Sequence, residues 1–421
     1  MLRVLRMRDF RLLWVARLNA TLAAGLLVVA VPAHMYAVTG SALATGLTLA
    51  VEYLPVLVLG PFAGVVADRW DRRRLMAGTD LVRVPVVCLL LFARTPETVW
   101  LVYPAVLAEG AAATLFRPAA QAHTPAVVGT GPALTGANAL NAVTSGTVGL
   151  VAAPLGAALF AAFGIGAVVT ASAAGYLASA TAIAFTRPYS RDRGPCRRVP
   201  AELRDGLSHL RRSPVARALL AAGGVYLAAN AALTAMLVPF GVTYLGGGTN
   251  VGWLLSALSA GFLLGAPISR RIVERFSART AIGCGQILVA GAFCVMFNAR
   301  SMPVALIAAF LLGIPGVTVL VAVQTWVQRT SPAALLGRVS AAFLTVEAAA
   351  TVLGAFAGPA LSELAGPPVA LNAACATTLA AAVLTFCLVP GSLSRPSSTV
   401  AHGDRKMTES VRRPARSDGS T

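Results

Sequence analysis

Apolar segments of roughly 20 residues follow one another along this chain, separated by short polar segments rich in arginine. A segment of that length crosses the hydrocarbon core of a bilayer as one α-helix. Hydrophobic residues make up 57% of the 421 residues and charged residues only 12%, about half the charged share of a soluble domain. So little charge excludes a water-soluble fold of this size and makes the lipid bilayer the natural solvent.

Within lipid, backbone N–H and C=O groups have no water to bond, so these segments are predicted to be helices. The pattern predicts an all-α membrane protein with twelve transmembrane helices. Charges, glycines and prolines place the helices at about 11–37, 43–67, 75–94, 98–117, 138–162, 164–186, 215–242, 250–270, 279–298, 303–328, 338–362 and 367–390.

The arginines give the predicted helices a direction. The chain carries 34 basic residues, and only Arg94 and Arg300 fall in the loops on one side of the membrane. Two more, Arg17 and Arg83, fall within predicted helices. Basic residues concentrate on cytoplasmic loops, so we expect both termini in the cytoplasm and the protein in the inner (plasma) membrane of the cell.

One long polar segment, residues 187–214, divides the predicted helices into two groups of six. Within it, Leu203, Leu207 and Leu210 form the apolar stripe of a short amphipathic helix, which we expect to lie on the cytoplasmic leaflet rather than to act as a regulatory site. The predicted domains are an N-terminal six-helix bundle at 1–186, this cytoplasmic linker, a C-terminal six-helix bundle at 215–390 and a disordered cytoplasmic tail at 391–421.

A weak internal repeat supports this division. The segment Thr124-Pro125-Ala126 precedes the fifth predicted helix, and Ser331-Pro332-Ala333 precedes the eleventh. Each is followed after a short gap by Leu-x-Gly, which ends at Gly136 and at Gly337. Parallel repeats of six helices are typical of one class of transporter folds.

The loop between the second and third predicted helices carries the most specific motif. Residues 60–74 read GPFAGVVADRWDRRR, and the glycines four apart permit another helix to approach closely. The loop resembles the signature of the major facilitator superfamily, G-x-x-x-D-R-x-G-R-R. The residues that match this signature are Gly64, Asp68, Arg69, Arg72 and Arg73. Gly60 lies outside the match and is the glycine four residues before Gly64. Asp71 stands where the signature has glycine.

The resemblance implies the major facilitator fold, in which two six-helix bundles enclose a central cavity. In that family the signature loop latches the two bundles in one access state. Carried over to this chain, Asp68 would face the start of the eleventh helix, near Gly337 and Arg338. The alternative is that the arginines of the loop only follow the cytoplasmic charge bias, which explains neither Asp68 nor the glycine spacing.

Four further segments resemble one branch of the superfamily, that of the enterobactin exporters and macrolide efflux proteins. They are RDFRLLW at 8–14, FRPA at 116–119, ANALN at 137–141 and LGRVS at 336–340. This resemblance implies export of a small molecule rather than uptake.

Three glutamates lie near the middle of predicted helices, where a charge is costly and therefore informative. At about 1.5 Å per residue, Glu52, Glu109 and Glu347 each fall close to the midplane of the bilayer. They are candidates for proton coupling or for binding a cationic group of the substrate, and the alternative for each is a structural role. Glu52 is the first choice, because its Glu-Tyr-Leu-Pro context resembles the exporter branch.

Three other ionisable residues inside predicted helices belong to the same candidate site. Asp80 and Arg83 are three residues apart on one helix, so they are placed to neutralise each other, and the structural interpretation of this pair is the stronger one. Arg17 lies nearer the cytoplasmic end of its helix, where its long side chain can extend to the interface.

The sequence gives no indication of an enzyme, a cofactor, a metal site or a nucleic-acid partner. The four histidines have no ligand spacing, the six cysteines form no C-x-x-C pair, and no G-x-x-x-x-G-K-[ST] loop occurs. The net charge of +18 resides in clusters without interleaved aromatic residues, which base stacking would need.

The leading hypothesis is a secondary active transporter that exports an amphipathic small molecule, such as a drug, an antibiotic or a siderophore, by proton antiport with alternating access. Its partners would be that molecule, the proton and the lipid bilayer, and we expect a monomer. One alternative is a proton-coupled uptake permease of the same fold. Another is a membrane protein that transports nothing, such as a sensor or an assembly factor.

Overall fold

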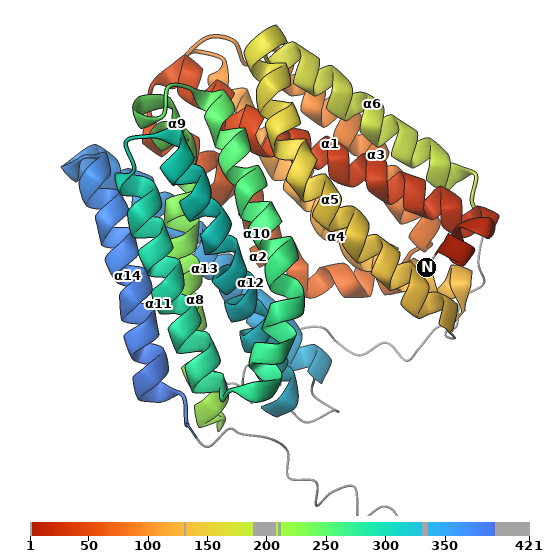
Figure 1. The fold of residues 1–421 in the computed structure, drawn as a ribbon. Helices are drawn as coiled ribbons and strands as arrows, with labels where there is room; N and C mark the ends of the chain where they lie inside the picture. Colours follow the sequence, from red (N-terminus) through yellow and green to blue (C-terminus); the bar gives the residue numbers. More distant parts are fainter. Residues whose placement is uncertain (1, 130–131, 188–207, 209–211, 331–335, 392–421) are drawn as a thin grey trace, which may run out of the picture.

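The computed structural model describes residues 2–129, 132–187, 208, 212–330 and 336–391, so most of the predicted linker and the tail lie outside the described residues. Every regular element in the described part is a helix (Figure 1). The α-helices are α1 (Arg8–Thr39), α2 (Ala42–Arg69), α3 (Arg72–Cys88), α4 (Val102–Val128), α5 (Pro132–Phe163), α6 (Ile165–Ala184), α8 (Pro214–Ala235), α9 (Leu237–Tyr244), α10 (Gly248–Arg275), α11 (Ala278–Asn298), α12 (Met302–Thr330), α13 (Leu336–Ala365) and α14 (Pro367–Leu388). Short 3-10 helices are η1 (Leu2–Arg6), η2 (Leu89–Leu91) and η3 (Val99–Leu101).

Eleven segments of the described chain are helical, long and apolar enough to cross a membrane. One of them, Pro214–Tyr244, consists of α8 and α9 together. The third predicted span, 75–94, corresponds to α3 and η2, and it is not among the eleven. α3 has 17 residues, of which the first three are arginines and two more are Asp80 and Arg83, so it is less apolar than the rest. The all-α membrane fold is therefore observed, and the twelfth crossing stays a prediction.

Side-chain caps and glycines determine where several helices begin and end. Ser41, Asp71, Ser213 and Ser277 each accept a hydrogen bond from the backbone N–H three residues further on, as N-cap side chains do. Asp71, which stands in place of the usual signature glycine, thus starts α3. Gly40 ends α1 with a φ of 65°, a left-handed conformation that costs glycine little.

α4 extends to Val128, beyond the predicted end of the fourth helix at about 117. Pro118 and Pro125 lie inside this helix without ending it. Ala119 and Ala120 are buried there, so the added turns pack against the rest of the protein instead of forming a loop. The predicted end of the fourth helix just before Pro118 is therefore wrong, because packing by neighbouring helices compensates for the backbone hydrogen bond that proline cannot make.

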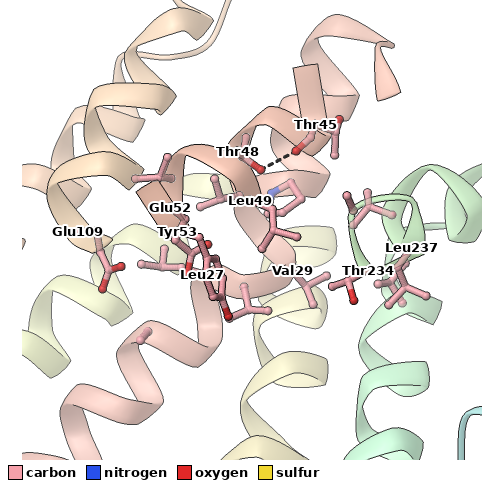
Figure 2. A pocket seen from close by; sticks show the side chains of 18 of the residues that line it. Leu27, Val29, Thr45, Thr48, Leu49, Glu52, Tyr53, Glu109, Thr234 and Leu237 are labelled. Carbon is pink, nitrogen blue, oxygen red and sulfur yellow. Dashed lines mark hydrogen bonds between the residues drawn. The ribbon is translucent and has the colours of Figure 1, made fainter. Parts of the chain in front are cut away.

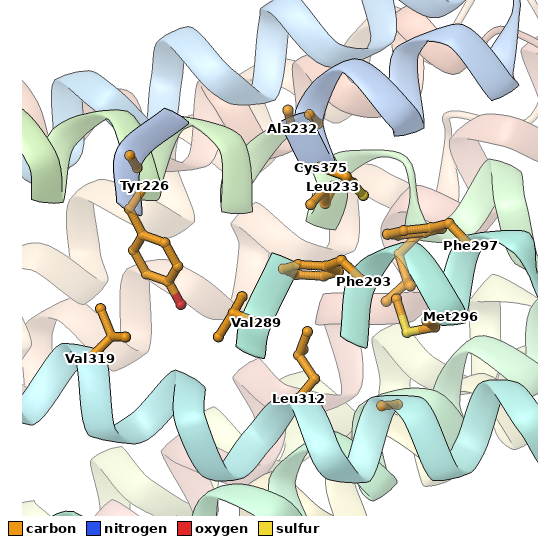
Figure 3. Packing of buried hydrophobic residues seen from close by; sticks show 14 of the residues in the cluster. Tyr226, Ala232, Leu233, Val289, Phe293, Met296, Phe297, Leu312, Val319 and Cys375 are labelled. Carbon is orange, nitrogen blue, oxygen red and sulfur yellow. The ribbon is translucent and has the colours of Figure 1, made fainter. Parts of the chain in front are cut away.

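The helices pack as two groups, α1 to α6 and α8 to α14, each around a buried apolar core (Figure 1). The core of the second group is built largely from aromatic and branched side chains (Figure 3). In it the rings of Phe293 and Phe297 stack with centroids 5.8 Å apart, and Phe240 meets Phe297 edge-on at 4.9 Å. Alanines of α1 and α5 also join this second core, which links the two groups.

Two helix pairs form the seam between the groups, α2 with α13 and α5 with α10. Small residues bring these helices close together. A Cβ atom on Gly46 of α2 would lie 2.8 Å from the carbonyl oxygen of Ala355 on α13, and one on Gly252 of α10 would lie 2.7 Å from the Cα of Pro154 on α5. Such contacts hold helices together in lipid, where burial of apolar surface gains nothing.

The two ends of the molecule differ in charge. The arginine-rich end holds the start of α1 and the α2–α3 and α10–α11 connections, with Arg69 and Arg275 beside them. The arginine-poor end holds Gly40, Gly164 and Gly366 in the connections between paired helices. The described contacts of the α2–α13 seam lie toward the arginine-poor end, and in Figure 1 the ribbons of α5 and α10 diverge toward the arginine-rich end.

Candidate functional site

A cavity of about 240 Å³ lies between the two groups of helices (Figure 2). Helices α1 to α4 and η2 line it from the first group, and α8, α9 and α10 from the second. Most of its lining side chains are apolar, and Leu27, Val29 and Leu237 are typical. The polar lining residues are Thr45, Thr48, Glu52, Tyr53, Glu109 and Thr234. An apolar wall with a few polar groups is the usual composition of a small-molecule site.

Glu52 presents its carboxylate to this cavity from α2 (Figure 2). The side chain is half-buried, and it makes no hydrogen bond or ion pair with any residue that the structure describes. Its position depends on a close approach of α4, because a Cβ on Gly110 would lie only 2.3 Å from the carbonyl oxygen of Glu52. Replacing that glycine would push α4, and with it Glu109, away from α2.

Glu109 lines the same cavity and also belongs to a buried network behind it. Its Oε1 accepts a hydrogen bond of 2.9 Å from the hydroxyl of Tyr176 on α6 and lies 3.5 Å from Nε of Arg83 on α3. Arg83 is 4% exposed and Glu109 13%, so this ion pair is largely shielded from solvent. The guanidinium also lies over the Tyr176 ring, 5.0 Å from its centroid.

Asp80 completes the network on the far side of Arg83. Its Oδ1 lies 3.0 Å from Nη1 of Arg83, and its Oδ2 accepts a hydrogen bond of 2.5 Å from the hydroxyl of Ser179. The carboxylate is fully buried. The sequence-based pairing of Asp80 with Arg83 is thus confirmed in geometry, and Arg83 holds Glu109 as well. This buried ion network links α3, α4 and α6.

Two of the predicted site residues lie elsewhere. Glu347, half-buried on α13, and Arg17, half-buried on α1, are not among the residues that line the cavity. The three midplane glutamates therefore do not form one cluster: Glu52 and Glu109 share a cavity, and Glu347 stands apart. Sequence distance from a helix end gives depth in the membrane, but it does not give the direction in which a side chain faces.

The predicted gating loop makes its described contacts within the first group of helices. Nη1 of Arg72 donates to the carbonyl oxygen of Ala122 at 2.8 Å, and Nε of Arg73 donates to that of Ile183 at 3.3 Å. These carbonyls lie near the ends of α4 and α6, where cations are favoured. Arg69 is exposed, and the surroundings of Gly64, Asp68, Gly337 and Arg338 fall outside what the structure describes.

Gly60 does not play the part expected of it in this conformation. The nearest atom to a Cβ built on Gly60 belongs to Val56 of the same helix, 3.9 Å away. The close approach of α13 to α2 is instead at Gly46, toward the arginine-poor end. The close approach that the spacing of Gly60 and Gly64 permits is therefore not made at Gly60 in this conformation, in which the seam closes at the opposite end of α2, and it stays a prediction.

Sequence reasoning did not find Tyr176, Ser179 or the equivalent pair in the second group. There, the hydroxyl of Thr385 on α14 donates to Oε1 of Gln286 on α11 at 2.7 Å. The same 99 residues separate Ser179 from Asp80 and Thr385 from Gln286. That equal spacing of polar residues in two apolar helices was the available signal.

Comparison with known proteins identifies the class of this molecule. Residues 2–409 match the family described as transmembrane secretion effector, MFS_3. The multidrug efflux pump Tap of Mycolicibacterium fortuitum is 28% identical over 372 residues, which cover 83% of this chain and 88% of that one. The enterobactin exporter EntS of Citrobacter koseri is 26% identical over 355 residues, covering 82% of this chain and 83% of EntS. The macrolide efflux protein A of Streptococcus pyogenes is 24% identical over 269 residues, or 61% of this chain and 66% of that protein.

Solved structures agree on the fold. The nucleoside transporter NupG superposes with a TM-score of 0.71 at 11% identity, covering 90% of this chain and 98% of that one. A bacterial homologue of the lysosomal transporter Spinster, in an inward-facing and unoccupied conformation, gives 0.70 at 16% identity, covering 90% and 96%. Since the family match spans nearly the whole sequence, the chain belongs to the transmembrane secretion effector family of the major facilitator transporters.

Proposed function

We propose that this protein exports an amphipathic small molecule and that inward movement of protons drives the export. The observation that carries the proposal is the Glu52 carboxylate, which has no partner among the described residues and lies on the wall of an apolar cavity between the two helix groups. An ionised carboxylate without a partner is costly in such surroundings, so it needs a proton or a cation to neutralise it. A carboxylate that binds a proton and the transported molecule in alternation can couple inward proton movement to outward movement of that molecule. The efflux relatives support the outward direction for the molecule.

The proposal includes a membrane topology. α3 makes the twelfth crossing, because it packs between α4 and α6, and its charged residues bond inside the first group rather than facing lipid. The arginine-rich end and both termini face the cytoplasm. The protein is a monomer in the inner membrane of the cell. The two helix groups act as the two domains of alternating access, connected by the linker at 187–214.

Gating is assigned to the α2–α3 loop. When the arginine-rich ends come together, Asp68 meets the start of α13 near Gly337 and Arg338, and Arg69, Arg72 and Arg73 hold the loop in place. The conformation described here, with the seam closed toward the arginine-poor end, is then the state that receives molecules from the cytoplasm. Glu347 and Arg17 lie away from the cavity and serve structural roles in this proposal.

Accumulation of toxic compounds in an efflux-deficient bacterial host tests the proposal. Cells that express the protein should accumulate less of at least one compound in a panel of antibiotics, dyes and siderophores, and a protonophore should abolish the difference. Glu52→Gln should lose the effect at normal membrane levels. Glu274→Gln, an exposed position away from the cavity, is the matched control and should keep it. Higher accumulation in expressing cells would instead indicate uptake, and no change with any compound would contradict transport of such molecules.

A further inference from the structure

The charge of the cavity points to the kind of molecule that enters it. The charged residues among its lining side chains are Glu52 and Glu109, and none of those lining residues is basic. Arg83 lies behind Glu109 and is already shared with Asp80. Arg117, an exposed residue on α4 that is not among the lining residues, is a cation whose field reaches Glu52. When all its groups are ionised, the network of Asp80, Arg83 and Glu109 has one negative charge in excess, and an ionised Glu52 adds a second.

We infer, on the basis of the proposed function, that the molecule carried is a lipophilic cation whose charged group binds against Glu52. The apolar wall formed by α1, α8 and α9 accepts its hydrocarbon part, and the lining threonines, whose hydroxyls donate to backbone carbonyls of their own helices, present acceptor oxygens. An anion of the same shape meets two carboxylates and no exposed cation on this wall. Like charges at close range in a low-dielectric site cost several kcal/mol, so selection by charge is strong.

Tetraphenylphosphonium and tetraphenylborate make a suitable pair of probes, because they have nearly the same shape and opposite permanent charges. Binding of each to the purified full chain in detergent is measured by isothermal titration calorimetry. The phosphonium should bind and the borate should not. Loss of the Coulomb attraction between the Glu52 carboxylate and the phosphonium in Glu52→Gln should weaken phosphonium binding by about 10- to 150-fold, which corresponds to about 1.5–3 kcal/mol. Glu274→Gln should bind like the wild type.

Equal binding of the two ions, binding of neither, or full affinity in Glu52→Gln would overturn the inference about charge. Each of these results is compatible with export of neutral molecules, which the accumulation assay measures separately. Circular dichroism and gel filtration of Glu52→Gln show whether that variant folds. The neutral glutamine keeps the shape of the side chain, so a folded variant is expected.

A different set of contacts carries a second inference, about how the two helix groups are held together. Glu363, near the end of α13, reaches across the seam to the beginning of α2. Its Oε1 accepts a hydrogen bond of 2.5 Å from the hydroxyl of Ser41 and one of 3.1 Å from the backbone N–H of Leu43. Ser41 is the N-cap of α2, and its hydroxyl oxygen also accepts from the N–H of Ala44 at 3.1 Å.

The geometry points to Glu363 as a latch that closes the arginine-poor end of the seam. A carboxylate from one helix group thereby occupies the N-terminus of a 28-residue helix of the other, where unpaired N–H groups and the helix dipole favour a negative charge. Below this contact, Gly46 of α2 lets Pro359 of α13 pack closely. The bonds of Glu363 break when the seam opens, so they stabilise the closed state and not the open one.

Hydrogen exchange measured by mass spectrometry on the full chain tests the latch. In Glu363→Ala the amides of residues 42–46 should exchange faster, since Leu43 loses its acceptor. Opening of the seam should also raise exchange in α5 and α10 around Leu150 and Ser256, which touch across the other helix pair through a hydrogen bond of 2.6 Å. Ser41→Ala keeps the Leu43 bond and should raise exchange around Leu150 and Ser256 less, while its loss of the N-cap acceptor of Ala44 acts only on the first turn of α2.

Glu97→Gln is the matched control, because Glu97 is an exposed glutamate in the loop that precedes α4 at the same end of the molecule. Its exchange should equal that of the wild type. Faster exchange confined to the first turn of α2 in Glu363→Ala would mean that Glu363 only caps that helix, and unchanged exchange would mean that it contributes nothing. Either result overturns the latch.

Discussion

The helix pair α3–α6 in the first group and the pair α11–α14 in the second are built alike but differ in charge. Asp80 is the ninth residue of α3, and Gln286 is the ninth residue of α11. Each accepts a hydrogen bond from a hydroxyl on the last helix of its group, Ser179 or Thr385. In the first pair the acceptor is a carboxylate with an arginine beside it, and in the second it is a neutral amide.

The difference continues along the helices. Three residues after Asp80 comes Arg83, and three residues after Gln286 comes Val289, which is buried in the apolar core of the second group. One hydrogen bond between equivalent helices is thus kept in both groups, while among the described residues ions are found at this level in the first group only. A structural bond needs no charge, as Gln286 demonstrates. The charges of the first group therefore require an explanation beyond packing, and their connection to the cavity through Glu109 supplies one.

The largest effect should come from removing the arginine. Arg83→Leu leaves Asp80 and Glu109 buried without a cation, which should lower the free energy of unfolding by about 3–5 kcal/mol. The equivalent change in the neutral pair, Val289→Ala, removes only two methyl groups and should cost about 1–3 kcal/mol. Titration with sodium dodecyl sulfate in mixed micelles measures both. Equal costs would show that the arginine serves packing alone.

Ser179→Ala and Thr385→Val compare the two hydrogen bonds directly. Loss of a donor to the Asp80 carboxylate should cost about 1.5–3 kcal/mol, and loss of the donor to the Gln286 amide about 0.5–1.5 kcal/mol. The same detergent titration checks both values. A larger cost for Thr385→Val would reverse the comparison and place the more important polar contact in the second group.

How far the sequence could predict this site depends on the range of each contact. Asp80 and Arg83 lie on one helix, so their pairing follows from spacing alone. The contact of Glu109 with Arg83 depends on how α3 packs against α4, and the Tyr176 bond depends on α6, 67 residues further along the chain. No local sequence pattern indicates these contacts between residues on different helices. The separation of Glu347 from the cavity is of the same kind, because helix rotation decides it.

More of the overall fold than of the candidate site could be predicted from the sequence. Apolar segments indicate membrane helices because each satisfies its own backbone bonds, and no long-range information is needed. The third span is the one crossing that stays a prediction, because charges that bond within the protein make α3 less apolar than its neighbours. The repeated N-cap, Asp71 before α3 and Ser277 before α11, was visible as an equal spacing in sequence but could not be distinguished from chance without the helices.

The N-caps of α3 and α11 allow a comparison in which the expected change in the free energy of unfolding is smaller than for the buried hydrogen bonds. The Asp71 carboxylate accepts from the N–H of Arg74 at 2.7 Å, and the Ser277 hydroxyl accepts from that of Thr280 at 3.3 Å. Asp71→Ala and Ser277→Ala should each cost about 1 kcal/mol, with the aspartate somewhat more important because its charge also interacts with the helix dipole. Detergent titration at low and high salt separates the two contributions, since only the charge effect is screened. A cost for Ser277→Ala above that for Asp71→Ala at low salt would contradict the ranking.

The smallest effect is expected where the two groups resemble each other most closely in sequence. Asp68-Arg69-Trp70-Asp71 before α3 corresponds to Glu274-Arg275-Phe276-Ser277 before α11. Glu274 pairs with Arg270 at 2.9 Å, but both side chains are more than half exposed, so water and salt screen the pair. Glu274→Gln should therefore change the free energy of unfolding by less than about 0.5 kcal/mol and leave transport intact.

If the proposed gate at Asp68 is correct, Asp68→Asn should have a similarly small effect on the free energy of unfolding and yet slow transport. A transport defect of equal size in Glu274→Gln would mean that both groups gate, and the functional asymmetry between them would then be confined to the buried ions.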